Sequence, residues 1–286
     1  MSQDPMPPLS AEEKRIILDK GTEAPGSGRF WKYDRNGSYL CRQCGAPLFS
    51  SGQKFDSGCG WPSFDQALSG AVKESLDADG LRTEITCARC GGHLGHVFRG
   101  EGLTDKDTRH CVNSLSLAFE PEESAVFAGG CFWGVEAFFS RVPGVISVES
   151  GYSGGFMENP DYEDVCTGQS GHAEAVRIVF NPEKISYEEL ACLFFEIHDP
   201  TQKDRQGWDI GPQYRSAVFY ADEKQRATAE KLVAELKAKG WPVETELTPL
   251  KNFYPAEEYH QKYFEKQGRG ACHSRVPRFS TPYERS

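Results

Sequence analysis

Cysteine is the residue type with the most obvious chemistry in this sequence. The chain of 286 residues contains ten cysteines, and six of them lie within the first 111 residues. In a reducing compartment, cysteines serve more often as metal ligands or catalytic thiols than as structural disulfides. A thiol becomes a good nucleophile where a cationic neighbour or a helix N-terminus favours the thiolate. The neighbours of each cysteine therefore indicate its role.

Four cysteines form two CxxC pairs, Cys41–Cys44 and Cys87–Cys90, each followed by a glycine that suits a tight turn. Two such pairs can complete the tetrahedral shell of four sulfurs typical of structural zinc. The gap between them, residues 45–86, is longer than in most zinc ribbons, so two redox motifs or reduced core thiols are the alternatives. We expect one structural zinc ion per chain, which stabilises the fold and does no chemistry.

Two further cysteines of the first half lie in polar motifs, Cys59 in SGCGWPSF and Cys111 in RHCVNS. His93 and His96 lie between these motifs. On a strand, Arg109 and Cys111 would point to the same face, so Arg109 or a histidine could favour the Cys111 thiolate.

Cys131 is the candidate nucleophile of the second half. It follows an apolar run and begins a predicted helix, where the helix dipole and free N–H groups favour a thiolate. Phe132 and Trp133 beside it suggest a pocket for a small apolar group. A buried core cysteine packed against aromatic rings is the alternative interpretation. We interpret Cys166 and Cys192 as core thiols.

The elements that would position these thiols differ between the two halves. Residues 38–119 contain short β-like runs separated by glycine-rich turns (39–40, 81–86, 93–98 and 112–119), after a helix start at Ser10–Glu13 with a capping box. This pattern predicts a mainly antiparallel β domain over residues 1–120. The acidic, proline-containing segment 120–124 is the predicted junction.

The second half, residues 125–286, alternates strands and helices. The predicted strands are 125–128, 145–150, 173–180, 217–220 and 244–248, and the predicted helices are 131–140, 187–198 and 222–239. The βαββαβ order predicts an α/β ferredoxin-like sandwich.

Composition limits the functional classes. The hydrophobic share of 38% is that of a globular protein, and the net charge of −10 argues against nucleic-acid binding. No run approaches the about 20 apolar residues of a membrane span, and residues 1–10 show no secretory leader pattern. We therefore expect a cytoplasmic protein that binds neither membrane nor nucleic acid.

The first-half motifs, in this order and over about residues 10–119, resemble those of a B-type peptide methionine sulfoxide reductase. The resemblance implies that Cys111 is the nucleophile and Cys59 the resolving thiol. It places Trp61 on the substrate methyl group and implies that the site is lined by His93, His96, Arg109 and Asn113. His96 is the stronger candidate acid, because His93 could instead be a satisfied core histidine.

The second-half motifs GCFWGVE, GYSGG, NPDY, GHAEA and residues 209–216 resemble an A-type peptide methionine sulfoxide reductase, over about residues 125–271. The resemblance implies that Cys131 is the nucleophile and Cys272 the resolving thiol. It makes Glu136 a supporting helix residue. Glu174 must be protonated to donate, so apolar surroundings should raise its pKa. The resemblance implies these further site residues: Tyr162 and Tyr214 near the sulfoxide oxygen, Asp209 organising the site, and Phe132 and Trp133 on the methyl group.

Together the two resemblances imply an enzyme that reduces both epimers of methionine sulfoxide, free or in oxidised proteins, R in the first half and S in the second. Each nucleophile would become a sulfenic acid and then a disulfide, which thioredoxin or a similar reductant would reduce, without an organic cofactor. A thiol peroxidase, a disulfide oxidoreductase, or a zinc-containing binding module fused to a degenerate enzyme are the alternatives. Spacing alone leaves open a disulfide between the halves.

Overall fold

The computed structural model describes residues 6–268 and 274–281, and the chain divides into two compact units at 1–122 and 123–286. The division falls inside the predicted acidic junction, but that junction is mostly strand. Strand β9 (Leu117–Pro121) ends the first unit and β10 (Glu123–Gly129) begins the second. Glu120 pairs with Ser38 and Glu123 with Phe180, so both sides of the boundary find partners within their own sheets.

Over the described residues from Met6 on, the first unit contains two antiparallel sheets and one short α-helix, α1 (Ala11–Ile17), which begins with the predicted capping box of Ser10 and Glu13. The three-stranded sheet has the order β2-β1-β9, with β1 (Gly37–Cys41) and β2 (Pro47–Ser50). The six-stranded sheet has the order β3-β4-β8-β7-β6-β5, with β3 (Lys54–Phe55), β4 (Ser63–Phe64), β5 (Val72–Leu76), β6 (Thr83–Cys87), β7 (His93–Arg99) and β8 (Thr108–Val112).

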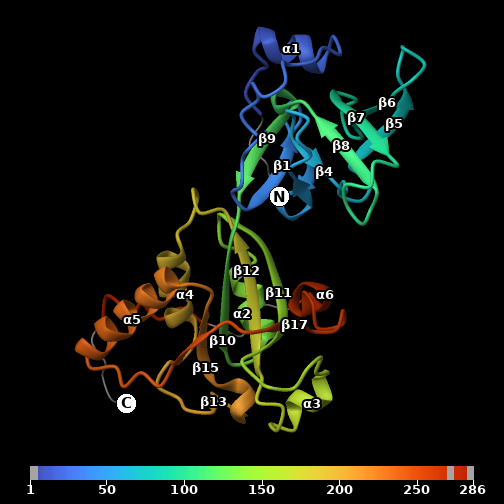
Figure 1. The fold of residues 1–286 in the computed structure, drawn as a ribbon. Helices are drawn as coiled ribbons and strands as arrows, with labels where there is room; N and C mark the ends of the chain where they lie inside the picture. Colours follow the sequence, from blue (N-terminus) through green and yellow to red (C-terminus); the bar gives the residue numbers. More distant parts are fainter. Residues whose placement is uncertain (1–5, 269–273, 282–286) are drawn as a thin grey trace. The chain divides into compact units, whose positions relative to one another are not determined.

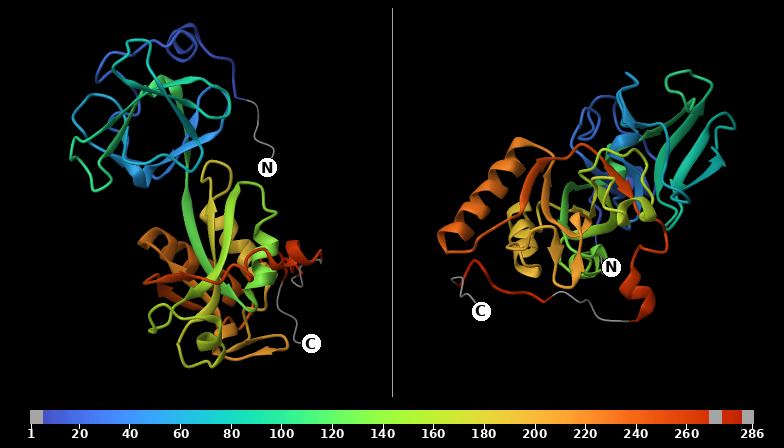
Figure 2. Two further views of the ribbon diagram at one scale, coloured as in Figure 1. Left: turned by 90° about the vertical axis from the view of Figure 1, so that its right-hand side faces the viewer. Right: turned by 90° about the horizontal axis from the view of Figure 1, so that it is seen from below.

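The strands of the first unit are drawn in blue to green in Figure 2. The two sheets share a hydrophobic core that includes Tyr39, Phe49 and Phe64. The predicted strand 112–119 is wrong in its middle. A 3-10 turn, Ser114–Ser116, separates β8 from β9, because the chain changes sheets there. The predicted strand 81–86 likewise begins only at Thr83.

The second unit has one six-stranded sheet in the order β16-β15-β10-β12-β11-β17 and a separate β13-β14 hairpin. Its helices are α2 (Phe132–Phe139), α3 (Tyr162–Cys166), α4 (Tyr187–Ile197), α5 (Glu223–Ala238) and α6 (Tyr263–Gln267). Its remaining strands are β11 (Val145–Ser153), β12 (Ala173–Phe180), β13 (Arg205–Gln206), β14 (Asp209–Ile210), β15 (Ser216–Tyr220), β16 (Glu246–Pro249) and β17 (Phe253–Pro255). Three of these helices begin at or next to the predicted first residues: Cys131 is the N-cap residue of α2, the Asp222 side chain caps α5, and Ser186 and Glu189 form a capping box at α4.

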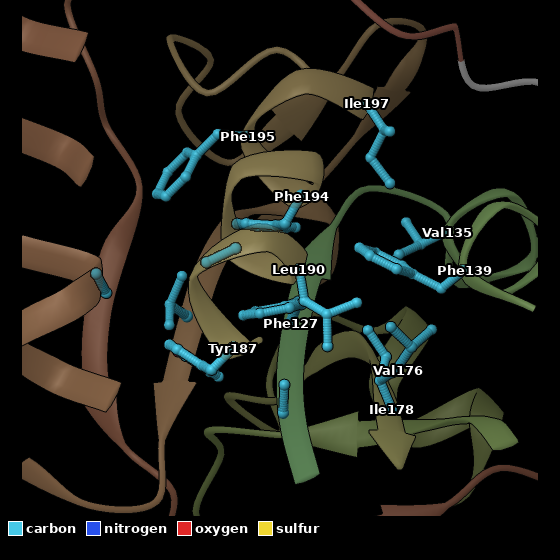
Figure 3. Packing of buried hydrophobic residues seen from close by; sticks show 14 of the residues in the cluster. Phe127, Val135, Phe139, Val176, Ile178, Tyr187, Leu190, Phe194, Phe195 and Ile197 are labelled. Atoms are coloured by element: carbon cyan, nitrogen blue, oxygen red, sulfur yellow. The ribbon is translucent and has the colours of Figure 1, made fainter. Parts of the chain in front are cut away.

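One face of this sheet packs against α2, α4 and α5 (Figure 1), and this layer holds the main core of the unit. Alternation along β12 decides which side chains reach it: Val176, Ile178 and Phe180 belong to the helix-covered core. Ala173 and Ala175 belong to a second, smaller cluster. In the main core, Phe127 stacks on Phe194 with ring centroids 4.7 Å apart (Figure 3).

Within the described residues, none of the helices combines the length and the apolar character that a membrane crossing needs.

The stacked pair makes Phe127→Ala a severe change. Phe127 is fully buried between the sheet and α4, and removing a buried phenyl ring typically costs about 3 to 5 kcal/mol. We expect a loss of this size in the free energy of unfolding of the second unit, measured by urea denaturation. Phe156→Ala is the matched control, since Phe156 is 79% exposed and should cost little. Equal losses in both variants would contradict this description of the core.

Candidate active sites and metal centre

The two CxxC pairs converge in the first unit. The four sulfurs of Cys41, Cys44, Cys87 and Cys90 all lie within 4.8 Å of one another. The Cys41–Cys90 and Cys44–Cys87 sulfurs are 3.6 and 3.7 Å apart. A tetrahedral zinc ion with bonds of about 2.3 Å needs sulfurs about 3.8 Å apart, so this donor set fits zinc. Each pair is followed by a glycine with positive φ, Gly45 and Gly91, whose N–H bonds back to the first cysteine of the pair.

The register of the six-stranded sheet places reactive side chains in a row. Cys111 on β8 pairs with Ser63 on β4 and with His96 on β7, and His96 pairs with Glu84 on β6. Directly paired residues of antiparallel strands share a face. Gly95 beside His96 must be glycine, because an added Cβ would lie 2.0 Å from the Cys111 carbonyl oxygen. The row therefore brings a thiol and an imidazole to one face of the sheet.

Cys59 lies beside this row, with its sulfur 3.8 Å from that of Cys111. Burial raises the pKa of the Cys111 thiol to about 12, the nearby Cys59 adds to this effect, and Arg109 opposes it. Burial also acts to raise the pKa of Cys59, but hydrogen bonds with Ser57 and Ser63 outweigh it and lower that pKa. In this reduced state, the negative charge of the pair is therefore favoured on Cys59 and not on Cys111.

The other cationic and imidazole groups of this site are already bonded to acids. The Arg109 guanidinium makes two hydrogen bonds to Glu101, of 2.7 and 2.8 Å, which raise its pKa. His96 Nε2 lies 2.5 Å from an oxygen of Asp77. His93 Nδ1 lies 2.7 Å from Glu84, in a buried position where desolvation lowers the histidine pKa. These acids were not identified from the sequence.

Glu23 is a further residue that sequence reasoning missed. Its backbone N–H donates to Asn113 Oδ1 at 3.1 Å, and its carbonyl accepts the Trp61 indole N–H at 3.1 Å. Its buried carboxylate accepts the backbone N–H groups of Ser114 and Leu115. Glu23 therefore fixes Trp61 and Asn113, two predicted substrate-binding residues. The partners are 38 to 92 residues away in sequence, so no local pattern reveals them.

A hollow of about 110 Å³ opens between these groups. Its lining includes Trp61, His96, Cys111 and Asn113, together with Arg82. His93 and Arg109 are not part of this lining, and their side chains bind Glu84 and Glu101. The hollow can hold a small group within reach of the Cys111 sulfur.

The second site is formed where β10 and β12 meet the start of α2. Cys131 is the N-cap residue of α2 and follows the last residues of β10. Glu174 lies two residues before Val176 on β12, so strand alternation directs its carboxyl to the helix-covered face. There the Phe132 N–H donates to Glu174 Oε2 at 3.0 Å. An acid thus occupies a core position beside the candidate nucleophile.

The surroundings keep Glu174 protonated near neutral pH. Burial raises its pKa to about 8, the nearby charge of Asp209 adds to this, and the Phe132 N–H only partly opposes it. Tyr162 and Tyr214 also lie within electrostatic reach of Glu174, and burial raises the pKa of both phenols. Carboxyl and phenol groups that stay neutral can donate protons or hydrogen bonds.

Aromatic rings line the other side of the second site. Trp133 stacks on Tyr263 with ring centroids 3.8 Å apart, and its indole N–H donates to His260 Nδ1 at 3.0 Å. The His260 ring also lies 5.2 Å from Phe132 and 4.4 Å from Tyr162. His260 and Tyr263 were not predicted as site residues, although both follow an acidic and aromatic stretch near the end of the chain.

Glu136 contributes to this arrangement from within α2. Both oxygens of its buried carboxylate accept the Lys262 N–H, at 2.8 and 2.9 Å. Lys262 has a positive φ and precedes α6, so Glu136 fixes the start of the helix that carries Tyr263. This contact agrees with the expected supporting role of Glu136.

Of the two cysteines predicted to be core thiols, Cys166 and Cys192, only Cys192 packs against the core. Cys166 is exposed at the end of α3 and not in the core, and its thiol is hydrogen-bonded with Tyr162. The helix α3 is too short to bury both sides, so only Val165 is covered. Cys192 is partly buried and packs against the main core. Cys272 lies outside the described residues.

Both halves of the chain are similar to known protein families. The sequence model described as "Peptide methionine sulfoxide reductase" matches residues 123–286, and that described as "SelR domain" matches residues 9–121. A "Peptide methionine sulfoxide reductase MsrA" from Methanosarcina mazei is 53% identical over 176 residues, which are 59% of this chain and 83% of the relative. One of the same name from Nautilia profundicola is 56% identical over 142 residues, 50% of this chain and 82% of the relative.

A solved structure agrees with the sequence relatives. Mxr1 from Saccharomyces cerevisiae in its reduced form is 36% identical, with a TM-score of 0.52, and the match covers 54% of this chain and 92% of Mxr1. The order of the two matched domains confirms both resemblances. The chain therefore belongs to the peptide methionine sulfoxide reductase family, and it joins a SelR, or B-type, domain at its N-terminus to an A-type reductase domain.

Proposed function

We propose that the chain reduces both epimers of methionine sulfoxide, free or in oxidised proteins, the R epimer in residues 1–120 and the S epimer in residues 125–286. The observation that carries this proposal is the protonated acid beside a thiol at a helix start, Glu174 and Cys131. Such a pair suits attack on the sulfoxide sulfur with proton donation to its oxygen. The paired thiols of the first half support the same chemistry there.

In the first half, Cys111 attacks the sulfoxide sulfur and the sulfoxide oxygen is protonated. The bond between this oxygen and the methionine sulfur then breaks, and the oxygen becomes bonded to the Cys111 sulfur. The Cys59 sulfur lies 3.8 Å away and takes up the Cys111 proton, a transfer that the higher pKa of Cys111 opposes and that bond formation to the sulfoxide sulfur drives. His96, held by Asp77, donates to the oxygen, and Trp61 contacts the methyl group. His93, Arg109 and Asn113 hold this arrangement. Methionine leaves, and Cys111 becomes a sulfenic acid that condenses with Cys59, releasing water.

In the second half, Cys131 attacks the sulfur, and Glu174 donates its proton to the oxygen. Tyr162 and Tyr214 donate hydrogen bonds to the same oxygen, while Asp209 helps keep Glu174 neutral. Phe132 and Trp133 surround the methyl group. The Cys131 sulfenic acid then condenses with Cys272. A dithiol reductant such as thioredoxin restores each pair by disulfide exchange, so no organic cofactor takes part.

The structural parts outside the two active sites also receive proposed roles. The four clustered cysteines hold one structural zinc ion, whose closed shell leaves no position for substrate. The second half is a ferredoxin-like sandwich, which the central strand order β15-β10-β12-β11 and the helices on one face support. Repair of oxidised proteins in the cytoplasm is the proposed biological role.

The thiol assignments predict separable activities. Cys111→Ser should abolish reduction of the R epimer and leave that of the S epimer, and Cys131→Ser should do the reverse, because serine cannot form a sulfenic acid. The measurement is methionine formed from each separated epimer with thioredoxin and its reductase. A peroxidase or disulfide oxidoreductase would reduce neither epimer. If either variant kept both activities, the assignment would be wrong.

The protonation of Glu174 predicts the pH dependence of the second half. The acid donates only when protonated and its pKa is about 8, so reduction of the S epimer should fall as pH rises through 8. Glu174→Gln should lower kcat about 10² to 10⁴-fold, the usual contribution of a general acid, and remove this fall. Activity on the R epimer in the same chain is the control. An unchanged pH profile in the variant would rule out Glu174 as the donor.

The cysteine cluster predicts one zinc ion per chain by elemental analysis. Cys44→Ser should lose the metal and lower the melting temperature of the first unit, because a structural metal contributes folding free energy. Cys192→Ser changes a cysteine outside the cluster and should keep the metal. Zinc retained in the Cys44 variant, or absent from the unmodified protein, would contradict the assignment.

A further inference from the structure

The β13-β14 hairpin carries two exposed apolar side chains that the catalytic chemistry does not use. Trp208 at its tip is 99% exposed, and Ile210 is 70% exposed. Tryptophan buries a large area when it is covered and is enriched at interfaces. Because Trp208 and Ile210 are both exposed on one short hairpin, we interpret this hairpin as a surface that another molecule covers.

Hydrogen bonds hold this hairpin in a fixed shape. The Gly207 N–H donates to Gln202 Oε1 at 2.7 Å, beside the tip. Gln206 both accepts from the Asp199 N–H and donates to the Asp199 carbonyl, at 3.0 and 3.1 Å. Trp208 is thus presented on an ordered support, which lowers the entropy cost of binding a partner.

The base of the hairpin belongs to the second active site. Gln206 packs so closely on Gly130, the residue before Cys131, that a Cβ on Gly130 would lie 2.6 Å from Gln206. Asp209 follows Trp208 directly and raises the pKa of Glu174. The base of the hairpin therefore lies beside Cys131 and Glu174, and its apolar tip begins next to the second active site.

We propose that Trp208 and Ile210 dock the polypeptide on either side of a methionine sulfoxide, and that they favour apolar neighbours in an extended segment. This inference rests on the proposed function and specifies its substrate class. In such a segment, a residue next to the methionine sulfoxide would contact the tip of the hairpin. Free methionine sulfoxide has no neighbouring residue that could make this contact. Unfolded, oxidised protein chains expose apolar segments of this kind.

The first half carries an independent example of the same design. Leu81, at the tip of the β5-β6 hairpin, is 89% exposed. Asp79 orders this tip by accepting the backbone N–H groups of Leu81 and Arg82, at 2.8 and 3.0 Å. The same hairpin supplies Asp77, which bonds to His96, and Arg82, which lines the hollow beside Cys111. Leu81 is thus assigned to dock polypeptide substrates of the first site.

The test uses the full-length protein with acetylated pentapeptides that contain one methionine sulfoxide of defined epimer, flanked either by leucines or by glycines. For Trp208→Ser, KM for the leucine-flanked S peptide should rise about 10-fold with kcat unchanged, as for loss of an apolar contact residue. Free S-methionine sulfoxide and the R peptides should be reduced at unchanged rates. Trp208→Phe should keep most of the affinity. Leu81→Ser should raise KM only for the leucine-flanked R peptide.

Other outcomes separate the two levels of the proposal. Equal loss with free and peptide substrates would place Trp208 in the pocket itself and overturn docking. Unchanged KM for every peptide, or equal KM for leucine and glycine flanks in the unmodified protein, would also overturn it. If the unmodified protein reduced neither epimer, the proposed function would fail, and the docking assignment would fail with it.

Discussion

Burial of ionisable groups is the constraint on which both sites depend. Glu174 occupies a position on β12 that alternation would give to an apolar side chain, and this placement keeps its proton at neutral pH. In the first unit, burial holds the Cys111 proton while hydrogen bonds favour charge on Cys59. Each fold thus fixes where protons lie before substrate enters. The cost of burying these groups is offset by the surrounding packing.

The two units use different geometry to place a thiol beside a proton donor. The first uses strand register, in which a row across four strands aligns Cys111 with His96, and a distant segment at Glu23 fixes the groups around it. The second uses the end of a strand and the start of a helix, where Cys131 and Glu174 meet. Unrelated scaffolds can therefore present a thiol and a proton donor to the same kind of oxidised sulfur.

Local patterns predicted the parts of the molecule that local forces determine. The capping box of α1, the long helix α5 and the alternation of β12 follow from short-range spacing, and the structure has all three. The four clustered cysteines could also be grouped from their motifs. Contacts between distant segments could not be predicted, among them Glu23 with Asn113 and Trp133 with His260. The exposed position of Cys166 was missed because helix burial depends on neighbours that no motif encodes.

The boundary between the units has a consequence for the persistence of the chain in a cell. Only Glu122 separates β9 from β10, and the residues on both sides are paired within sheets. A protease must accommodate several residues of locally unfolded chain before it can cut, and exposed loop tips are its usual targets. This connection offers no such loop. Degradation at the boundary would require the edge of one sheet to open first, so the boundary is protected for as long as the sheets stay folded.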